Sequence, residues 1–277
     1  MKDYNVEFSW NILWVVENKH FDYPFWDREK TLCSLELFSN IRDSVLIAID
    51  WSKFTSNIIS IDGTNYNYDS VNFLKSWVDG VILSWLNDVK RERLFNKSYI
   101  WIILWVADCA PIIWSMKNWE SVFNLHVWYK WLFWNWEIDN PWILYNFFEK
   151  LSKNNISISD LEKIHLWPMA WNDFELPFPY YHNLSKYFFQ NYRLLNPNDY
   201  FFLNWNQNEK WDDLWNFDLR RLIIDIIKYH WVSQDIVSSS GIDTTNLNNN
   251  WPSYRLFSKS LQAKNNRLSA SIRKMIK

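Results

Sequence analysis

Glycine is nearly absent from this sequence, which has only 3 glycines among its 277 residues. Ordinary chains carry glycine at roughly 7% of positions, so most turns and helix ends that need a positive φ lack their usual residue here. Cysteine is scarce as well: the two cysteines, Cys33 and Cys109, exclude a disulfide framework. The formal net charge of −2 provides no basic surface for a nucleic acid.

Long apolar runs are also missing. The longest, Ile100 to Ala107, is far too short to span a bilayer, and residues 1–7 lack the apolar core of a secretory signal. We therefore expect a cytoplasmic protein with no membrane and no nucleic-acid partner. Hydrophobic residues make up 48% of the chain and charged residues 22%, which favours a folded domain over a disordered one.

Tryptophan is in excess, at 22 positions. Several of these positions suit glycine: Trp251 precedes Pro252 in an Asn-rich turn, and Trp231 follows a helical pattern, where a positive φ is common. Some bacterial lineages read the codon UGA as glycine, whereas a common alternative code reads it as tryptophan. The other explanation is a truly tryptophan-rich protein, but such a protein has no reason to lose its turn glycines. We predict that most of these residues are glycine in the native protein, including Trp105, Trp128, Trp131, Trp167, Trp231 and Trp251.

Short segments rich in isoleucine and valine, bounded by turn residues, predict β-strands. The predicted strands are 44–50, 57–62, 78–84, 100–107 and 121–126. Helical spacing of apolar residues predicts helices at 219–230, after Pro141, and at about 184–195. Strands and helices do not alternate strictly, so the pattern favours an α+β fold with mixed sheets. The basic end, Arg273 and Lys274, is interpreted as a tail.

The residues with the most chemical potential lie at the ends of two predicted strands. Asp108 and Cys109 follow the strand at 100–107, and His126 ends the strand at 121–126. A thiolate and an imidazole at neighbouring strand ends can bind Zn²⁺ or form a nucleophile–base pair. On spacing alone, a buried thiol and a structural histidine are the more common explanation of such a pattern.

Longer segments around these residues resemble a known family. With Trp105, Trp128 and Trp131 read as glycine, residues 105–112 become Gly-Val-Ala-Asp-Cys-Ala-Pro-Ile and residues 125–132 become Leu-His-Val-Gly-Tyr-Lys-Gly-Leu. These segments resemble the T-A-D-C-x-P and H-A-G-W-R-G signatures of the YfiH/laccase-domain family. Further segments resemble other family motifs in the same order along the chain: 166–176, 217–219, 253–255 and 266–272.

The resemblance covers residues 44–277, with residues 1–43 as a divergent N-terminal part of the same domain. It implies mixed β-sheets stacked between helices, in α/β/β/α layers. It also implies a zinc site of His, Cys and His, which older family names describe as the copper site of a polyphenol oxidase. Cys109 and His126 match two of these metal ligands, while Phe54 stands at the position of the first histidine.

The family resemblance also implies a function. It indicates a zinc-dependent enzyme acting on purine nucleosides by phosphorolysis, with phosphate as the second substrate, or by hydrolytic deamination. Cys109, His126 and Asp108 are the implied catalytic residues, and Lys130 and Arg255 are the implied anion contacts. Two alternatives stay open: an amidase that edits peptidoglycan precursors, and a degenerate member of the family without metal or activity, which Phe54 favours.

Overall fold

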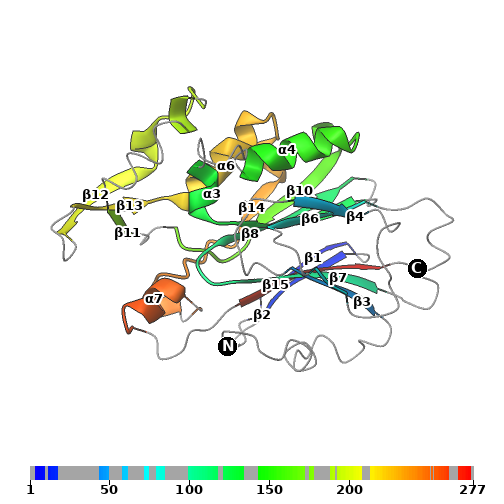
Figure 1. Ribbon diagram of the computed structural model, residues 1–277, viewed down its shortest axis with the longest axis horizontal. Helices are drawn as coiled ribbons and strands as arrows, with labels where there is room; N and C mark the ends of the chain where they lie inside the picture. The colour runs from blue at the N-terminus through cyan, green and yellow to red at the C-terminus, as the bar shows by residue number, and fades with distance from the viewer. Residues whose placement is uncertain are drawn as a thin grey trace.

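The computed structural model describes most of the chain from residue 99 onwards and shorter stretches before it. The described residues are 4–9, 12–17, 44–49, 58–61, 72–74, 79–84, 99–117, 121–133, 143–171, 175–177, 188–190, 192–207, 213–249, 251, 253–261 and 268–275. Two six-stranded sheets and one three-stranded sheet organise them (Figure 1). No helix in this part of the chain is both long and apolar enough to cross a bilayer.

The first six-stranded sheet, here called the outer sheet, contains both ends of the described chain. In spatial order its strands are β1 (Tyr4–Ser9), β2 (Ile12–Glu17), β15 (Leu268–Met275), β7 (Tyr99–Val106), β3 (Ser44–Ile49) and β5 (Asn72–Leu74). β15 pairs antiparallel with both β2 and β7, whereas β3 pairs parallel with β7 and β5. The sheet is therefore mixed. The interpretation of the basic end as a tail is wrong, because Arg273 and Lys274 lie inside β15.

The second six-stranded sheet, here called the central sheet, carries the candidate site. Its strands are β14 (Val237–Ser239), β10 (Leu161–Leu166), β8 (Ala110–Met116), β9 (Ser121–Val127), β6 (Gly80–Ser84) and β4 (Ile58–Ile61). β9 pairs antiparallel with both of its neighbours, β8 and β6. At the two edges of the sheet, β14 pairs parallel with β10, and β4 pairs parallel with β6. Every residue of β8 and β9 is buried, because one face of this sheet meets helices and the other meets the outer sheet.

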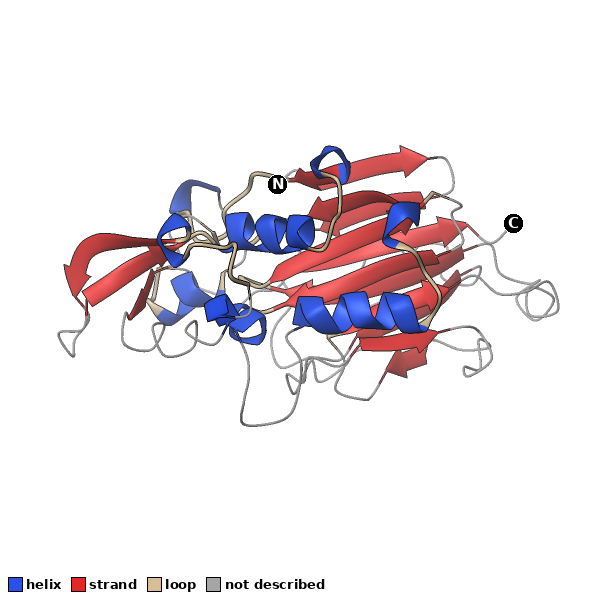
Figure 2. Cartoon of the chain, turned by 90° about the horizontal axis from the view of Figure 1, so that it is seen from above, coloured by secondary structure: helices blue, strands red, loops and turns tan. Residues whose placement is uncertain are grey.

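Two amphipathic helices cover the central sheet on the side away from the outer sheet (Figures 1 and 2). The helices are α4 (Ile143–Lys153) and α6 (Leu219–Tyr229), each with one buried apolar face. The predicted face of α6 is the observed one, formed by Leu219, Leu222, Ile223, Ile226 and Ile227. Asp218 caps the helix, since its Oδ1 accepts the backbone N–H of Arg221 at 2.9 Å. The order helix, sheet, sheet among the described residues confirms the predicted α+β class.

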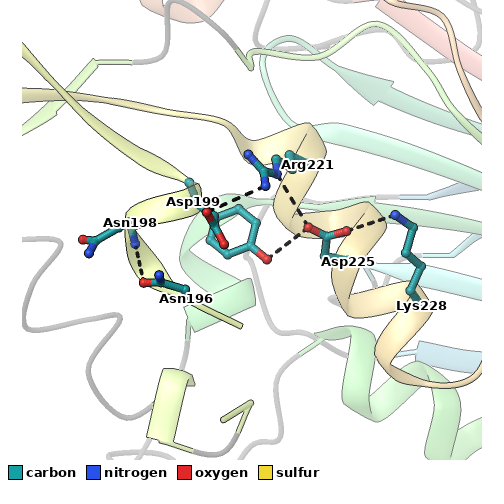
Figure 3. Close-up of polar contacts among 7 residues, drawn as sticks. Asn196, Asn198, Asp199, Arg221, Asp225 and Lys228 are labelled. Atoms are coloured by element: carbon teal, nitrogen blue, oxygen red, sulfur yellow. Dashed lines mark hydrogen bonds and ion pairs between the residues drawn. The ribbon is translucent and has the colours of Figure 1, made fainter. Parts of the chain in front are cut away.

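A polar network fixes α6 to the turn that precedes β12 (Phe201–Gln207), as Figure 3 shows. Arg221 lies 3.8 Å from both Asp199 and Asp225. Asp225 also accepts hydrogen bonds from the Tyr200 hydroxyl at 3.1 Å and from Lys228 at 3.2 Å. These contacts lie at the partly exposed edge of the helix layer, so they orient α6 and add little free energy of folding themselves.

One predicted helix is shorter than expected. Residues 188–190 are helical, but residues 192–195 form a turn that leads into a 3-10 helix at Pro197–Asp199. A small third sheet follows, which was not predicted from the sequence. Its strands are β12, β13 (Asp213–Phe217) and β11 (Glu175–Pro177).

Candidate functional site

Cys109 and His126 are brought together because the chain changes sheets immediately before Cys109. β7 ends at Val106 in the outer sheet, residues 107–109 form a bend, and β8 begins at Ala110 in the central sheet. β8 then pairs with β9 so that Pro111 lies opposite His126. The bend therefore places Cys109 beside the end of β9, where His126 lies. The cysteine is partly exposed, whereas the histidine is 1% exposed.

The imidazole of His126 contacts two ionisable side chains. Its Nδ1 lies 3.1 Å from Oδ1 of Asp79, and the ring is also hydrogen-bonded to the thiol of Cys109. Burial lowers the pKa of His126, but a thiolate at Cys109, the hydrogen bond to Asp79 and the hydrogen bond to Cys109 outweigh burial and raise the pKa to about 10. Cys109 and Asp79 thus both stabilise the protonated ring.

Asp79 contacts His126 but was not singled out from the sequence. It immediately precedes β6 and is fully buried. Its backbone oxygen accepts the N–H of His126 at 2.7 Å, which extends the β6–β9 pairing by one residue beyond Gly80 and Leu125. A usable signal was present: an acidic residue stands at the head of an apolar strand prediction, directly before one of the 3 glycines.

Gly80 leaves room for side chains that pack over β6. A Cβ atom at Gly80 would lie 2.3 Å from Cδ2 of Leu125 and 3.2 Å from Cγ1 of Ile58, and both atoms belong to buried side chains. A side chain here would therefore force Leu125 to move within the core beside His126. Gly80 is a strand position where a neighbouring side chain occupies the space of a Cβ.

Asp108 lies beside Cys109 in sequence but points to a different set of partners. Its Oδ1 accepts from the Thr244 hydroxyl at 3.0 Å, and its Oδ2 accepts from the backbone N–H of Arg255 at 2.8 Å. Burial raises its pKa, while hydrogen bonds from Ser253, Arg255 and Thr244 oppose that rise. The carboxyl group thus joins the 243–245 turn and the start of α7 (Tyr254–Ser258) to the bend that carries Cys109.

The structure gives a side-chain contact for one predicted anion contact, Arg255, and the backbone position of the other, Lys130. Arg255 donates from Nη1 to the backbone oxygen of Glu175, so its guanidinium is held toward β11. Lys130 lies in the first turn of the short helix α3 (Tyr129–Phe133), which follows directly after β9. That turn begins close to His126 along the chain. Phe54 lies outside the described residues.

Segments that resemble family motifs converge on this bend, although they are far apart in sequence. The backbone N–H of Ala170 donates to the oxygen of Asp108 at 3.0 Å, and the N–H of Trp167 donates to the oxygen of Pro111 at 3.1 Å. Met169 exchanges backbone hydrogen bonds with the 242–244 segment. Residues 167–170, 243–245 and 253–255 therefore surround the 107–109 bend.

The donor set partly fits the zinc site that the sequence resemblance implies. A metal-bound histidine usually holds its other nitrogen to a carboxylate or carbonyl oxygen, and Asp79 supplies that contact on Nδ1. Nε2 and the sulfur of Cys109 are then two available ligands on one side of the site. Among the described residues, no group of three or more histidine, cysteine and acidic side chains has metal-binding geometry. A three-ligand zinc site here would need a ligand beyond the groups of the described residues.

Comparisons with known proteins give a fold but no close relative. No protein-family model matches the sequence, and no curated protein matches it. Among solved structures, the chain is similar to the hypothetical protein YfiH of Bacillus licheniformis, with a TM-score of 0.58, 13% identity, and coverage of 94% of this chain and 91% of that one. It is similar to NMB0706 of Neisseria meningitidis, with a TM-score of 0.63, 12% identity, and coverage of 99% and 98%.

A third similar structure agrees with the first two. YlmD of Geobacillus stearothermophilus matches with a TM-score of 0.60 and 12% identity, over 96% of this chain and 92% of that chain. All three matches span nearly the full length of both partners, so they concern the whole arrangement of sheets and helices. Four of the segments of this sequence that resemble the YfiH/laccase-domain motifs, 105–112, 125–132, 166–176 and 253–255, contribute residues around one bend of that arrangement. The chain therefore has the YfiH-type fold that its motifs predicted.

Proposed function

We propose that the chain is a zinc-dependent enzyme of the YfiH/laccase-domain type that acts on purine nucleosides. The observation that carries the proposal is the contact between the Cys109 thiol and the His126 imidazole, with Asp79 on the far nitrogen of the ring. Cys109 and His126 would hold the metal. Zinc bound there would polarise a water or phosphate oxygen for attack on the nucleoside.

The chain's own residues have distinct tasks in this proposal. In phosphorolysis a phosphate oxygen forms a bond to C1′ of the ribose while the bond from C1′ to the purine nitrogen breaks, and the departing base takes up a proton. Asp108 is the proposed proton-transfer group, because burial raises its pKa in the direction that such a role needs. Lys130 and Arg255 are the proposed contacts for phosphate, and Lys130 would act as a point charge.

A degenerate member of the family without metal is the second candidate. The observation that favours it is the two-ligand donor set: three protein ligands plus a water are usual in catalytic zinc sites. Phe54 occupies the sequence position at which the motif alignment expects the remaining histidine. An aromatic ring has no lone pair for a metal. This candidate predicts a folded protein with weak zinc binding and no turnover.

Zinc content and nucleoside phosphorolysis, measured on protein made with UGA read as glycine, separate the two candidates. We expect Cys109→Ala and His126→Ala to abolish both zinc uptake and purine release, with Cys33→Ala as the matched control that changes neither. Phe54→His should raise zinc affinity if that position faces the site. Purine release that survives Cys109→Ala and ignores chelators would overturn the proposal.

A further inference from the structure

We propose that Asp79 is the positioning residue of this site: it keeps a proton on Nδ1 of His126, so that Nε2 is the nitrogen offered to Cys109 and to a bound metal. The inference rests on the proposed function for the identity of the metal. The orientation of the ring follows from contacts within the chain. It concerns a residue that no family motif quoted above includes.

Asp79 holds His126 at two points. Its backbone oxygen accepts the N–H of His126 at 2.7 Å, and its Oδ1 lies 3.1 Å from Nδ1 of the ring. The side chains of Asp79 and His126 are 1% and 2% exposed, so water does not compete for either group. A contact through backbone and side chain together leaves the ring little freedom to rotate about χ1 and χ2.

The chemistry of the carboxylate decides which nitrogen carries the proton. An ionised carboxylate can only accept hydrogen bonds, so Nδ1 has to be the donor in this pair. The ring also has a hydrogen bond to Cys109, and Nε2 is the nitrogen that remains for it. This holds whether the ring is neutral or cationic, because Nδ1 keeps its proton in both forms. Zinc or a substrate proton then exchanges at Nε2 only.

The strand pairing makes this orientation rigid. Asp79 is placed by the register of β6 on β9, in which Gly80 lies opposite Leu125. The side chain of Leu125 packs over Gly80, where a Cβ atom would lie 2.3 Å from its Cδ2. Asp79 therefore meets His126 through a fixed pair of buried strands, and no loop has to order to make the contact. A site built on strands holds its donor atoms more accurately than one built on loops.

The experiment measures which ring nitrogen of His126 is protonated, by ¹⁵N–¹H NMR of histidine-labelled protein, with and without added Zn²⁺. Zinc affinity is measured in parallel by competition with a chromophoric chelator. The variants are Asp79→Ala, which removes the acceptor for Nδ1, and Asp79→Glu, which keeps the charge. Asp225→Asn is the matched control, because Asp225 accepts from Tyr200 and Lys228 on α6 and does not contact His126.

We expect a proton on Nδ1 in the wild-type chain and in Asp225→Asn, and its loss in Asp79→Ala. Zinc affinity should fall about 10- to 100-fold in Asp79→Ala, the range typical for loss of a carboxylate behind a metal-binding histidine, whereas Asp79→Glu should retain part of it. A wild-type ring with no proton on Nδ1 overturns the inference without any variant. So does an Asp79→Ala protein that keeps both the Nδ1 proton and the zinc affinity.

Failure of the proposed function gives a different result. If the wild-type chain takes up no Zn²⁺ yet Nδ1 is protonated and loses that proton in Asp79→Ala, the metal is wrong and the positioning role of Asp79 stands. If zinc binds and Asp79→Ala changes neither readout, the metal stands and Asp79 has only a structural role before β6.

Discussion

Replacing Trp231 by glycine should stabilise this protein, which is the opposite of what loss of an indole does in a core. Trp231 directly follows α6 and its cap residue His230. Its φ is +66°, in the left-handed region, and its side chain is 93% exposed. The backbone N–H of Trp231 donates to the oxygen of Lys228 at 2.8 Å, so the conformation closes the helix end. Asn155 has the same backbone sign after α4, with a φ of +56°, and asparagine is a residue that tolerates it.

The size of the effect follows from these two numbers. A side chain at 93% exposure buries almost no apolar area, so its removal costs little hydrophobic free energy. A left-handed conformation costs an L-residue about 1–2 kcal/mol that glycine does not incur. Glycine also gives the unfolded chain greater conformational freedom, which lowers the free energy of unfolding by roughly 0.5–1 kcal/mol. The net gain in the free energy of unfolding should be about 1 kcal/mol.

Trp231→Ala is the matched control, because alanine also lacks the indole but keeps the Cβ that makes a positive φ unfavourable. Urea unfolding followed by far-ultraviolet circular dichroism compares the variants without depending on tryptophan fluorescence. We expect Trp231→Gly to be more stable than both Trp231→Ala and the tryptophan-containing chain. Trp114→Gly should lose several kcal/mol, because Trp114 is fully buried against Phe147, with ring centroids 4.4 Å apart. A Trp231→Gly protein less stable than Trp231→Ala would refute the reasoning.

Three further predictions follow from sequence composition, burial and hydrogen bonding. Peptide mass spectrometry of the protein from its native host should find glycine at positions 231 and 251, and tryptophan at both would exclude the decoding interpretation. Burial lowers the pKa of His165 from 6.5 to about 4. As the pH falls, the unfolded chain binds a proton at this histidine before the folded chain does, so the free energy of unfolding should fall by up to ~3 kcal/mol between pH 6.5 and pH 4. Urea titrations over this range should show a smaller decline in His165→Gln, and an equal decline would contradict the assignment. Asp108→Ala leaves the hydroxyl of Thr244 and the N–H of Arg255 without their acceptor, so it should cost about 1–3 kcal/mol for each buried group, and a variant as stable as the parent in urea would show that the bend does not depend on this carboxylate.

The sequence predicted those parts of the fold whose signal is local. Strand predictions at 44–50, 57–62 and 121–126 match β3, β4 and β9 to within about a residue at each end, because turn residues bound each apolar segment. The helix at 219–230 was predicted for the same reason, with a strong N-cap and an unbroken apolar face. β8 was missed because only the bend at residues 107–109 separates it from β7, and its seven residues are all buried, so no polar alternation marks it.

The features that local sequence patterns did not predict depend on pairing between strands far apart in the sequence. β15 looks like a basic tail when read alone, but it lies between β2 and β7, more than a hundred residues away in sequence from either. The same limit applies to the site. Cys109 and His126 stood out because each belongs to a motif, whereas Asp79 is joined to His126 across 47 positions by the register of β6 on β9. Register is set by the packing of side chains between strands. Here the side chain of Leu125 occupies the space that a Cβ at position 80 would fill.

This argument also links the two unusual features of the chain. Glycine is favoured where a buried neighbour fills the space of a Cβ and where a helix ends at positive φ, and the sequence has glycine at position 80 but tryptophan at position 231. At Gly80 an added Cβ would meet the buried side chain of Leu125 at 2.3 Å. At position 231 the side chain is exposed to solvent, so an indole can be accommodated at the cost of backbone strain alone. A substitution at Gly80 should therefore disturb the packing beside the Asp79–His126 pair, whereas substitutions at exposed turns should change stability without changing metal binding.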